Sequence, residues 1–275
     1  MLTRRHTFGL AAGTMVFPAL AKDQPAIAAK ITPQQFDRWL DMRGGVDGPA
    51  FWYSEGFVRP IADNGRIAAR MLGAETWITP AALRTPTTAI SLSRKIYFLL
   101  EKDRDVIATD KTTGKPFRPS IYAFQVRKFT LRDGAIGYEV ESHDLRGSRH
   151  GGAEAVFTFT SFGDQAHVNY GSYPVRAGAN GVVSTAGEIY DYVDNGAQLK
   201  DVAARYQMTW TSATLDGRIA NMHGWRFAAF DDIPNAWLKS TIREKAPLWM
   251  APPRDMAEIE SIRTNTPYAV PGLGL

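Results

Sequence analysis

Short runs of aromatic and β-branched residues, separated by turn signals, recur along the middle of this chain. Such runs are typical of β-strands, and connections too short for crossover helices favour an antiparallel meander. The pattern predicts eight strands, at residues 51–58, 66–78, 89–100, 104–109, 121–132, 135–144, 153–162 and 165–175. A glycine-rich stretch at 176–204 is interpreted as an insertion with a short helix near 197–204, and a strand resumes at 205.

Helical signals are found only near the two ends of the chain. Thr32 can cap a helix over 32–42, Pro33 suits its first position, and Gly44-Gly45 stops it. Two short helices are predicted at 234–245 and 253–262. We therefore predict a mainly β protein: a single antiparallel β-barrel or strongly curved sheet of eight to nine strands, with an N-terminal helix and a C-terminal helical extension. An NTF2-like cone is the nearest rival.

The turn Asp133-Gly134 fixes the register of the hairpin over 121–144, because it is a two-residue turn signal. Side chains alternate along a strand, so the cross-strand pairs on one face follow. They are Phe129 with Tyr138, Arg127 with Val140, Gln125 with Ser142 and Ala123 with Asp144. The opposite face is charged and suits solvent.

The same logic applies to the neighbouring strands. Gly163-Asp164 places Phe157 opposite Tyr170 on an apolar face. Along 89–100, Arg94 shares the face of Leu92 and Ile96, which is expected to point inward. The inward set of 205–211 is Tyr206, Met208 and Trp210.

The predicted barrel interior is thus aromatic but carries Arg94 and Arg127, with Gln125, Ser142 and Asp144 at one end. A buried charge without a partner costs several kcal/mol, so these groups must pair or meet a ligand. One interpretation is structural: Arg127 pairs with Asp144, or Arg94 pairs with another carboxylate. The other is a small-molecule pocket with an aromatic lining and convergent polar groups.

Two function classes follow. The first is a cofactor-independent enzyme of lyase, isomerase or hydrolase type, acting on a small aromatic or hydrophobic substrate that can bear a carboxylate. Its catalytic residues would be Asp144 as general acid/base, Tyr170 as proton donor and Arg127 as the stabiliser of negative charge. Its substrate-binding residues would be Arg94, Gln125, Tyr138, Ser142 and Trp210. The alternative is a non-catalytic periplasmic protein that binds a hydrophobic carboxylate with Arg94 and Arg127 as the anion clamp.

The amino-acid composition limits the classes of partner and cofactor that the protein can bind. The chain is 44% hydrophobic and 22% charged, which is typical of a globular protein. No run of four basic residues is found, so the sequence shows no basic segment of the kind that binds nucleic acid. Cysteine is absent, which excludes thiolate sites, and the histidines lack the spacing of metal ligands. We expect no cofactor and no metal.

The first 21 residues resemble an export signal, with Arg4 and Arg5, an apolar stretch to Leu20 and a small-x-small cleavage site. The paired arginines are similar to a twin-arginine signal, with the general secretory route as the alternative. A membrane anchor is disfavoured because Pro18 cuts the apolar run short of the roughly 20 residues that a span needs. The prediction is a periplasmic or secreted protein with a single domain over 22–275 and no membrane span after cleavage.

Three blocks of the chain resemble a known family. They are "DMRGGVDGPAFWYSEGFVRPI", "SLSRKIYFLLEKDRDVIATDKTTGKPFRPSIYAFQVRKFTLRDGAIGYEVE" and "PPRDMAEIESIRTNTPYAVPGL". Their arrangement over about 36–270 is similar to the exported bacterial proteins grouped as domain of unknown function 1838. The resemblance implies an exported, β-rich, single-domain protein and carries no reaction or functional residues.

Overall fold

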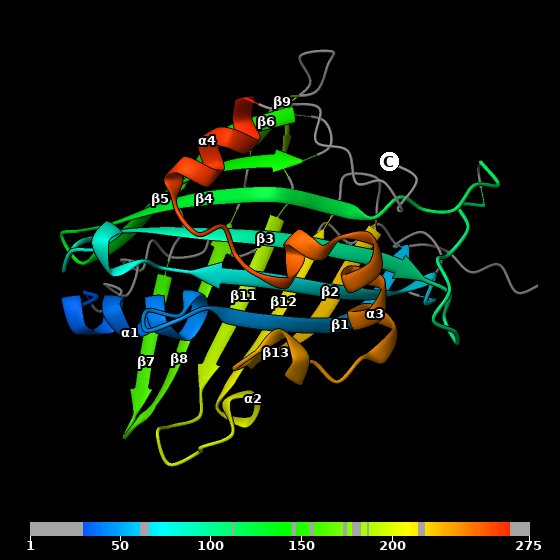
Figure 1. Cartoon of the computed structure of the whole chain (residues 1–275). Coiled ribbons are helices and arrows are strands. Elements are labelled where there is room, and N and C mark those ends of the chain that lie inside the picture. Colours follow the sequence, from blue (N-terminus) through cyan, green and yellow to red (C-terminus); the bar gives the residue numbers. More distant parts are fainter. Residues whose placement is uncertain are drawn as a thin grey trace, which may run out of the picture.

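The structure is a computed structural model (Figure 1). It describes residues 30–60, 66–111, 113–144, 147–154, 157–172, 175–177, 183–185, 187–213 and 218–264. The signal predicted at 1–21 lies outside these residues. None of the described helices is long and apolar enough to cross a membrane.

One antiparallel, barrel-like sheet dominates the molecule. In sheet order its eleven strands are β6 (Gly147–Glu154), β5 (Ala135–Asp144), β4 (Ser120–Arg132), β3 (Thr88–Leu100), β2 (Ala69–Ile78), β1 (Ala50–Pro60), β13 (Arg218–Phe227), β12 (Tyr206–Ala213), β11 (Gly187–Asp194), β8 (Gln165–Ser172) and β7 (Phe157–Phe162). A separate hairpin joins β9 (Val175–Ala177) to β10 (Val183–Thr185). In Figure 1, β1 to β5 run across the view and β7, β8 and β11 to β13 cross behind them. The sheet is nearly closed around one interior cluster, in which Trp39 contacts both Phe129 of β4 and Phe157 of the edge strand β7.

The prediction of a mainly β barrel-like sheet is confirmed, but eight to nine strands is too few. No strand forms at 104–109, where single bridges join Leu100 to Ile107 and Thr109 to Pro116. The run predicted at 153–162 divides into β6 and β7, and the stretch interpreted as an insertion contains β11. Tyr190 and Tyr192 point inward there, but the alternate positions include the apolar Ile189 and Val193, so the strand lacks a clear apolar–polar alternation.

The register of both hairpins is largely confirmed. Phe129 pairs with Tyr138, Arg127 with Val140, Gln125 with Ser142, and Phe157 with Tyr170. The pairing of Ala123 with Asp144 is wrong, because Asp144 pairs with Tyr122. A β-bulge in β4 inserts one extra residue, which shifts the register on both of its neighbours.

Helix α1 (Pro33–Gly44) packs into one end of the barrel. Its predicted start is confirmed: Thr32 and Gln35 form a capping box, and Pro33 follows the cap. Gly45 ends the helix at a φ of 65°, a conformation that favours glycine. Inside the barrel the Trp39 ring lies 4.7 Å from Phe129, edge to face, so the helix closes the aromatic core.

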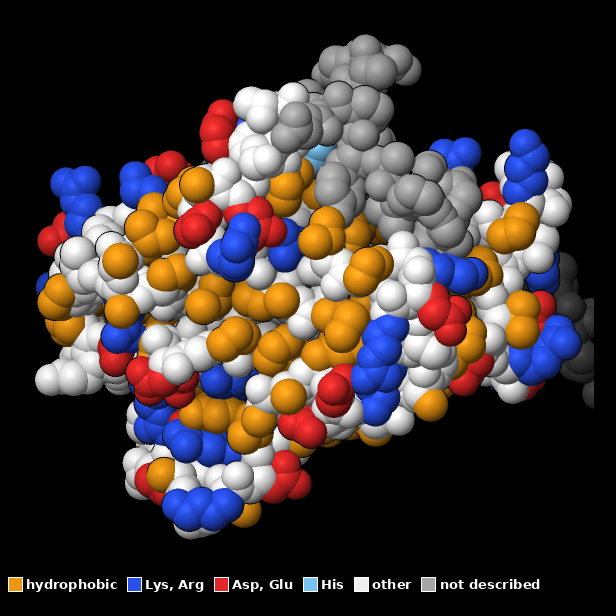
Figure 2. Space-filling view, viewed as in Figure 1, with side chains coloured by type: hydrophobic (Ala, Val, Ile, Leu, Met, Phe, Trp, Pro, Cys, Tyr) orange, Lys and Arg blue, Asp and Glu red, His pale blue; other side chains and the backbone are white. Residues whose placement is uncertain are grey.

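The other helices lie outside the barrel. Helix α2 (Val202–Arg205) is a single turn, and α3 (Ala236–Lys245) and α4 (Met256–Thr264) confirm the predicted C-terminal helices. Short 3-10 turns lie at Ala81–Leu83 (η2), Phe230–Asp232 (η3) and Pro247–Met250 (η4). Helices α3 and α4 lie across the outer face of the sheet (Figure 1). Figure 2 shows hydrophobic side chains across the middle of this face and charges of both signs around them.

The even-numbered residues of β3 point to this outer face, which corrects the predicted orientation. Leu92 packs with Ile259 of α4, and Ile96 packs in the cluster that contains Leu238 and Ile242 of α3. The sequence pattern identified a buried face here, but both faces of β3 are buried. Hydrophobicity alone therefore could not say which face is the interior.

Arg94 is on the outer face and is not a ligand-binding residue of the barrel interior. Its guanidinium pairs with Glu258 of α4 and donates to the carbonyl oxygens of Ala123, Leu248 and Ala251 at 3.0 to 3.2 Å. The ion-pair interpretation of Arg94 is the correct one. This side chain fastens the C-terminal segment to the sheet.

Replacing Arg94 with Met should lower the free energy of unfolding by about 3–5 kcal/mol, because it strands a half-buried carboxylate and three carbonyls. Urea denaturation measures this loss. The control is Arg254→Met, which removes the exposed arginine on the other oxygen of Glu258 and should cost about 1 kcal/mol or less. Equal losses in the two variants would contradict the assignment.

Candidate functional site

Three cationic side chains gather around one indole ring inside the barrel. The ring belongs to Trp77 of β2, which is fully buried. The guanidinium carbon of Arg43 lies 4.0 Å from the ring centroid, Lys95 Nζ lies 4.8 Å away and the guanidinium carbon of Arg127 lies 5.5 Å away. The cations come from α1, β3 and β4, and none is more than 7% exposed. The fold therefore concentrates positive charge in its core.

One buried carboxylate, Glu75 of β2, lies among these cations. Its Oε2 is 2.9 Å from Lys95 Nζ and accepts the indole N–H of Trp77 at 2.7 Å. Its Oε1 accepts the hydroxyl of Tyr97. Glu75 and Lys95 face each other across β2 and β3, so the register of the sheet dictates this pair. Glu75 thus balances one of the three cations.

The two arginines form no ion pair with any residue that the structure describes. Arg43 donates to the hydroxyl of Tyr192 at 3.3 Å, and its Nη1 has no acceptor in the described part of the chain. Arg127 lies over Tyr138 as well as Trp77, and its Nε has no acceptor among the same residues. Glu188 is near enough to act on Arg127 electrostatically, and its carboxylate accepts the hydroxyl of Tyr190 at 2.8 Å.

Burial and charge shift the pKa values of the cluster in different directions. Burial lowers the pKa of Lys95 to about 8, against the attraction of Glu75, and the nearby Arg127 and Arg43 lower it further. Burial alone would raise the pKa of the Glu75 carboxyl, but Lys95 and the hydrogen bond from Tyr97 hold it below its usual value. Glu75 stays ionised, and Lys95 titrates at mildly alkaline pH, near 8.

Aromatic side chains of β7, β8, β11 and β12 form a wall on the interior side of the sheet. The Tyr170 ring stacks 4.5 Å from Phe157 and 5.0 Å from Tyr190, and Tyr190 lies 6.2 Å from Trp210. Burial raises the pKa of Tyr170, although Arg43 and Arg127 oppose the rise. At neutral pH its phenol is therefore protonated, beside two guanidinium groups.

A polar row continues the cationic cluster across β3, β4 and β5. Gln125 donates to Ser142 at 2.9 Å, and Ser93 is its register partner on β3. The Oε1 atom of Gln125 and the hydroxyl of Ser93 are buried without a hydrogen-bond partner. These groups add acceptors and donors beside the guanidinium groups.

Most of the predicted site residues share the interior, with two exceptions. The structure brings Arg127, Gln125, Tyr138, Ser142, Tyr170 and Trp210 to the same side of the sheet. Arg94 is on the opposite side, and the side chain of Asp144 lies outside the described residues. Its predicted role as general acid/base therefore stays a prediction.

Sequence reasoning missed Arg43, Glu75 and Lys95. Arg43 lies in the last turn of α1, where a basic residue is ordinary, and only the docking of that helix brings it inside. Glu75 and Lys95 each lie mid-strand in an apolar run. A charged residue at such a position indicates a buried ion pair. A residue of opposite charge at the facing position of the adjacent strand would have identified the pair.

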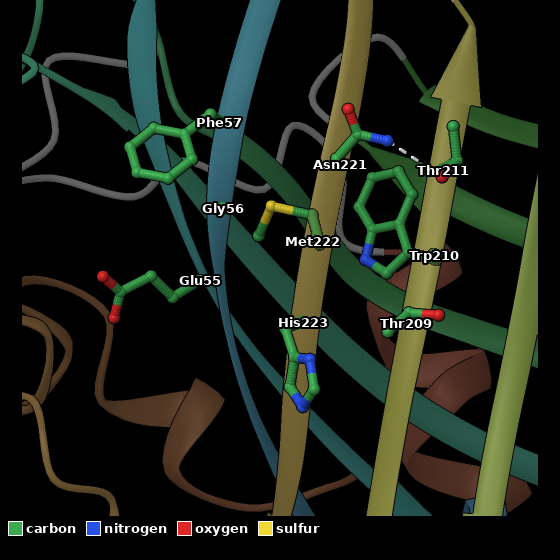
Figure 3. Close-up of a pocket in the computed structure, with 9 residues that line it drawn as sticks. All are labelled: Glu55, Gly56, Phe57, Thr209, Trp210, Thr211, Asn221, Met222 and His223. Atoms are coloured by element: carbon green, nitrogen blue, oxygen red, sulfur yellow. Dashed lines mark hydrogen bonds between the residues drawn. The ribbon is translucent and has the colours of Figure 1, made fainter. Parts of the chain in front are cut away.

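An open groove on the outer face is the second candidate (Figure 3). It measures about 380 Å³ and is lined by β1, β12 and β13. Its side chains include Glu55, Phe57, Thr209, Thr211, Asn221 and His223. Asn221 donates to Thr211 at 3.0 Å, and Glu55 accepts from Tyr53. Because the groove is open and holds no cluster of buried charges, we place the candidate site in the interior.

No protein-family model matches the chain, and no curated protein matches it. Among the described residues, no three His, Asp or Glu side chains are placed to hold a metal ion.

Replacing Glu75 with Gln should destabilise the protein by about 3–5 kcal/mol, because three buried cations then lack their anion. The double variant Glu75→Gln/Lys95→Met should recover at least half of this loss. Urea denaturation of the two variants and of Lys95→Met measures the coupling. A single-variant loss below about 1 kcal/mol would contradict the buried pair.

The Lys95 amine should also make stability depend on pH. Its pKa is lower in the folded state than in the unfolded state, where it is near 10.5, so the unfolded chain binds more protons from about pH 8 upward. The stability of the natural chain relative to Lys95→Met should therefore rise by roughly 1 kcal/mol per pH unit between about pH 8 and 9.5. A flat difference over this range would mean that Lys95 is not desolvated.

Proposed function

We propose that this protein binds a small organic anion with an aromatic or hydrophobic body inside its barrel. The observation that carries the proposal is the imbalance of buried charge around Trp77: three cations, of which only Lys95 forms an ion pair, with Glu75, among the described residues. Each uncompensated buried ion costs several kcal/mol. A ligand carboxylate would offset that cost and fill the open hydrogen-bonding positions on Arg43 and Arg127.

The aromatic wall supports the second half of the proposal. A ring held by its carboxylate at Arg127 would meet Tyr138 and the edges of the stacked Tyr170 and Tyr190 rings, which are all buried. Stacked or edge-to-face aromatic contacts contribute about 0.5–1.5 kcal/mol each beyond the area that they bury. The preferred ligand is therefore a planar aromatic carboxylate.

This proposal develops the binding alternative and replaces Arg94 with Arg43 in the clamp. The enzymatic prediction depended on Asp144 as the proton acceptor. The acids on the interior side of the described residues include Glu75, which is ionised and holds Lys95, Trp77 and Tyr97, and Glu188, which accepts from Tyr190. Membership of the family grouped as domain of unknown function 1838, and export to the periplasm, remain part of the proposal and agree with a small-molecule binder outside the cytoplasm.

Calorimetric titration with cinnamate and cinnamamide tests the charge requirement directly. The acid should bind, and the neutral amide should bind at least about 10-fold more weakly, since a hydrogen bond to a charged group contributes about 1.5–3 kcal/mol. Equal affinities for the acid and the amide would contradict an anion site.

Replacing Arg127 with Met should weaken cinnamate binding by about 10- to 100-fold. The free energy of unfolding should stay the same or increase, because the variant removes a buried charge without an ion-pair partner. The control is Arg132→Met, an exposed arginine at the end of the same strand, which should change neither quantity. A large loss of stability in Arg127→Met would indicate a structural role instead.

A further inference from the structure

The proposed function leaves one buried nucleophile without a role. Lys95 Nζ lies in the same cluster as the two arginines, over the Trp77 ring, and its ion-pair partner is Glu75. The backbone sets this placement: the bulge in β4 pairs Lys95 with Tyr122 on the interior side, while Arg127 lies farther along the same strand. A ligand whose carboxylate meets Arg127 would therefore extend past Trp77 within reach of an amine.

We propose that Lys95 forms an imine with the keto group of an aromatic 2-oxo acid bound in the barrel. This inference rests on the proposed anion site, because the arginines must hold the carboxylate. A 2-oxo acid places its carbonyl carbon next to its carboxylate. Arg43, Arg127 and Lys95 lie close together around one indole ring. This arrangement suits a 2-oxo acid better than a ligand whose carbonyl group is far from its carboxylate.

The surroundings of Lys95 supply what imine formation needs. Burial and the two guanidinium groups lower the pKa of its amine, so a substantial share is unprotonated at mildly alkaline pH. Glu75 is 2.9 Å from Nζ and can accept the proton that the ammonium releases. Tyr97 and Trp77 both donate to Glu75, which holds the carboxylate at the amine.

The atoms balance without an oxidant or reductant. The Nζ lone pair attacks the carbonyl carbon to give a carbinolamine, whose hydroxyl leaves as water with the proton returned by Glu75. The product is an iminium and one water molecule. The iminium retains the positive charge of the original ammonium, so Glu75 remains its counter-ion in a core of the same net charge.

Reductive trapping tests the inference. The natural protein is incubated with phenylpyruvate and sodium cyanoborohydride, and the labelled lysine is located by peptide mass mapping. We expect an adduct with the mass of the ligand less one oxygen atom, on Lys95 in preference to the exposed Lys128. The adduct should be absent in Lys95→Met. It should fall at least 10-fold in Arg127→Met, in which Lys95 is still present, and be unchanged in the surface control Arg132→Met.

Phenyllactate separates the two proposals, because it keeps the carboxylate and the ring but has no carbonyl. One outcome is that phenyllactate binds by calorimetry while phenylpyruvate labels Lys95 no more than Lys128. This outcome would overturn the imine and leave the anion site intact. If neither acid binds, both proposals fail. Labelling of Lys95 that is unchanged in Arg127→Met would contradict the role of the arginines in holding the carboxylate.

Discussion

The excess of buried positive charge around Trp77 is the constraint on which the rest of this structure depends. Cation–π contacts of roughly 0.5–2 kcal/mol each cannot by themselves offset a desolvation cost of several kcal/mol per ion. Glu75 offsets one charge, and its two other donors keep it in place. The fold imposes the remaining imbalance: the docking of α1 brings in Arg43, and the sheet register aligns Lys95 with Glu75.

Other buried charges in the molecule are fully paired, which makes the interior cluster exceptional among the described residues. Asp194 is buried, yet it receives Arg38 and Arg205, each at 2.9 Å, and a backbone N–H from Gly196. Arg94 is equally buried and meets Glu258 and three carbonyls. Charges that serve structure are neutralised here, whereas Arg43 and Arg127 are not. This difference is the physical reason for proposing that the interior binds a ligand.

Local patterns predicted most of the fold but only part of the site. Turn residues fixed the register of both hairpins, and with it the interior positions of Gln125, Arg127 and Tyr170. The predictions that failed depended on contacts between elements that are far apart in the sequence. The interior face of β3 was misassigned because helices bury its outer side as completely as the barrel buries its inner side. Arg43 could not be identified as an interior residue from the sequence, because only the docking of α1 brings it into the barrel. Neither fact is encoded in the alternation of a single strand.

The most direct measurement is a crystal structure with a brominated aromatic carboxylate, such as 4-bromocinnamate, in which anomalous scattering locates the bromine. The account predicts one ordered ligand inside the barrel, with its carboxylate within hydrogen-bonding distance of Arg127 and Arg43 and its ring against Tyr170. The account would be contradicted by a ligand that binds only in the outer groove between Phe57 and His223. It would also be contradicted if, at saturating ligand, neither arginine contacted the carboxylate.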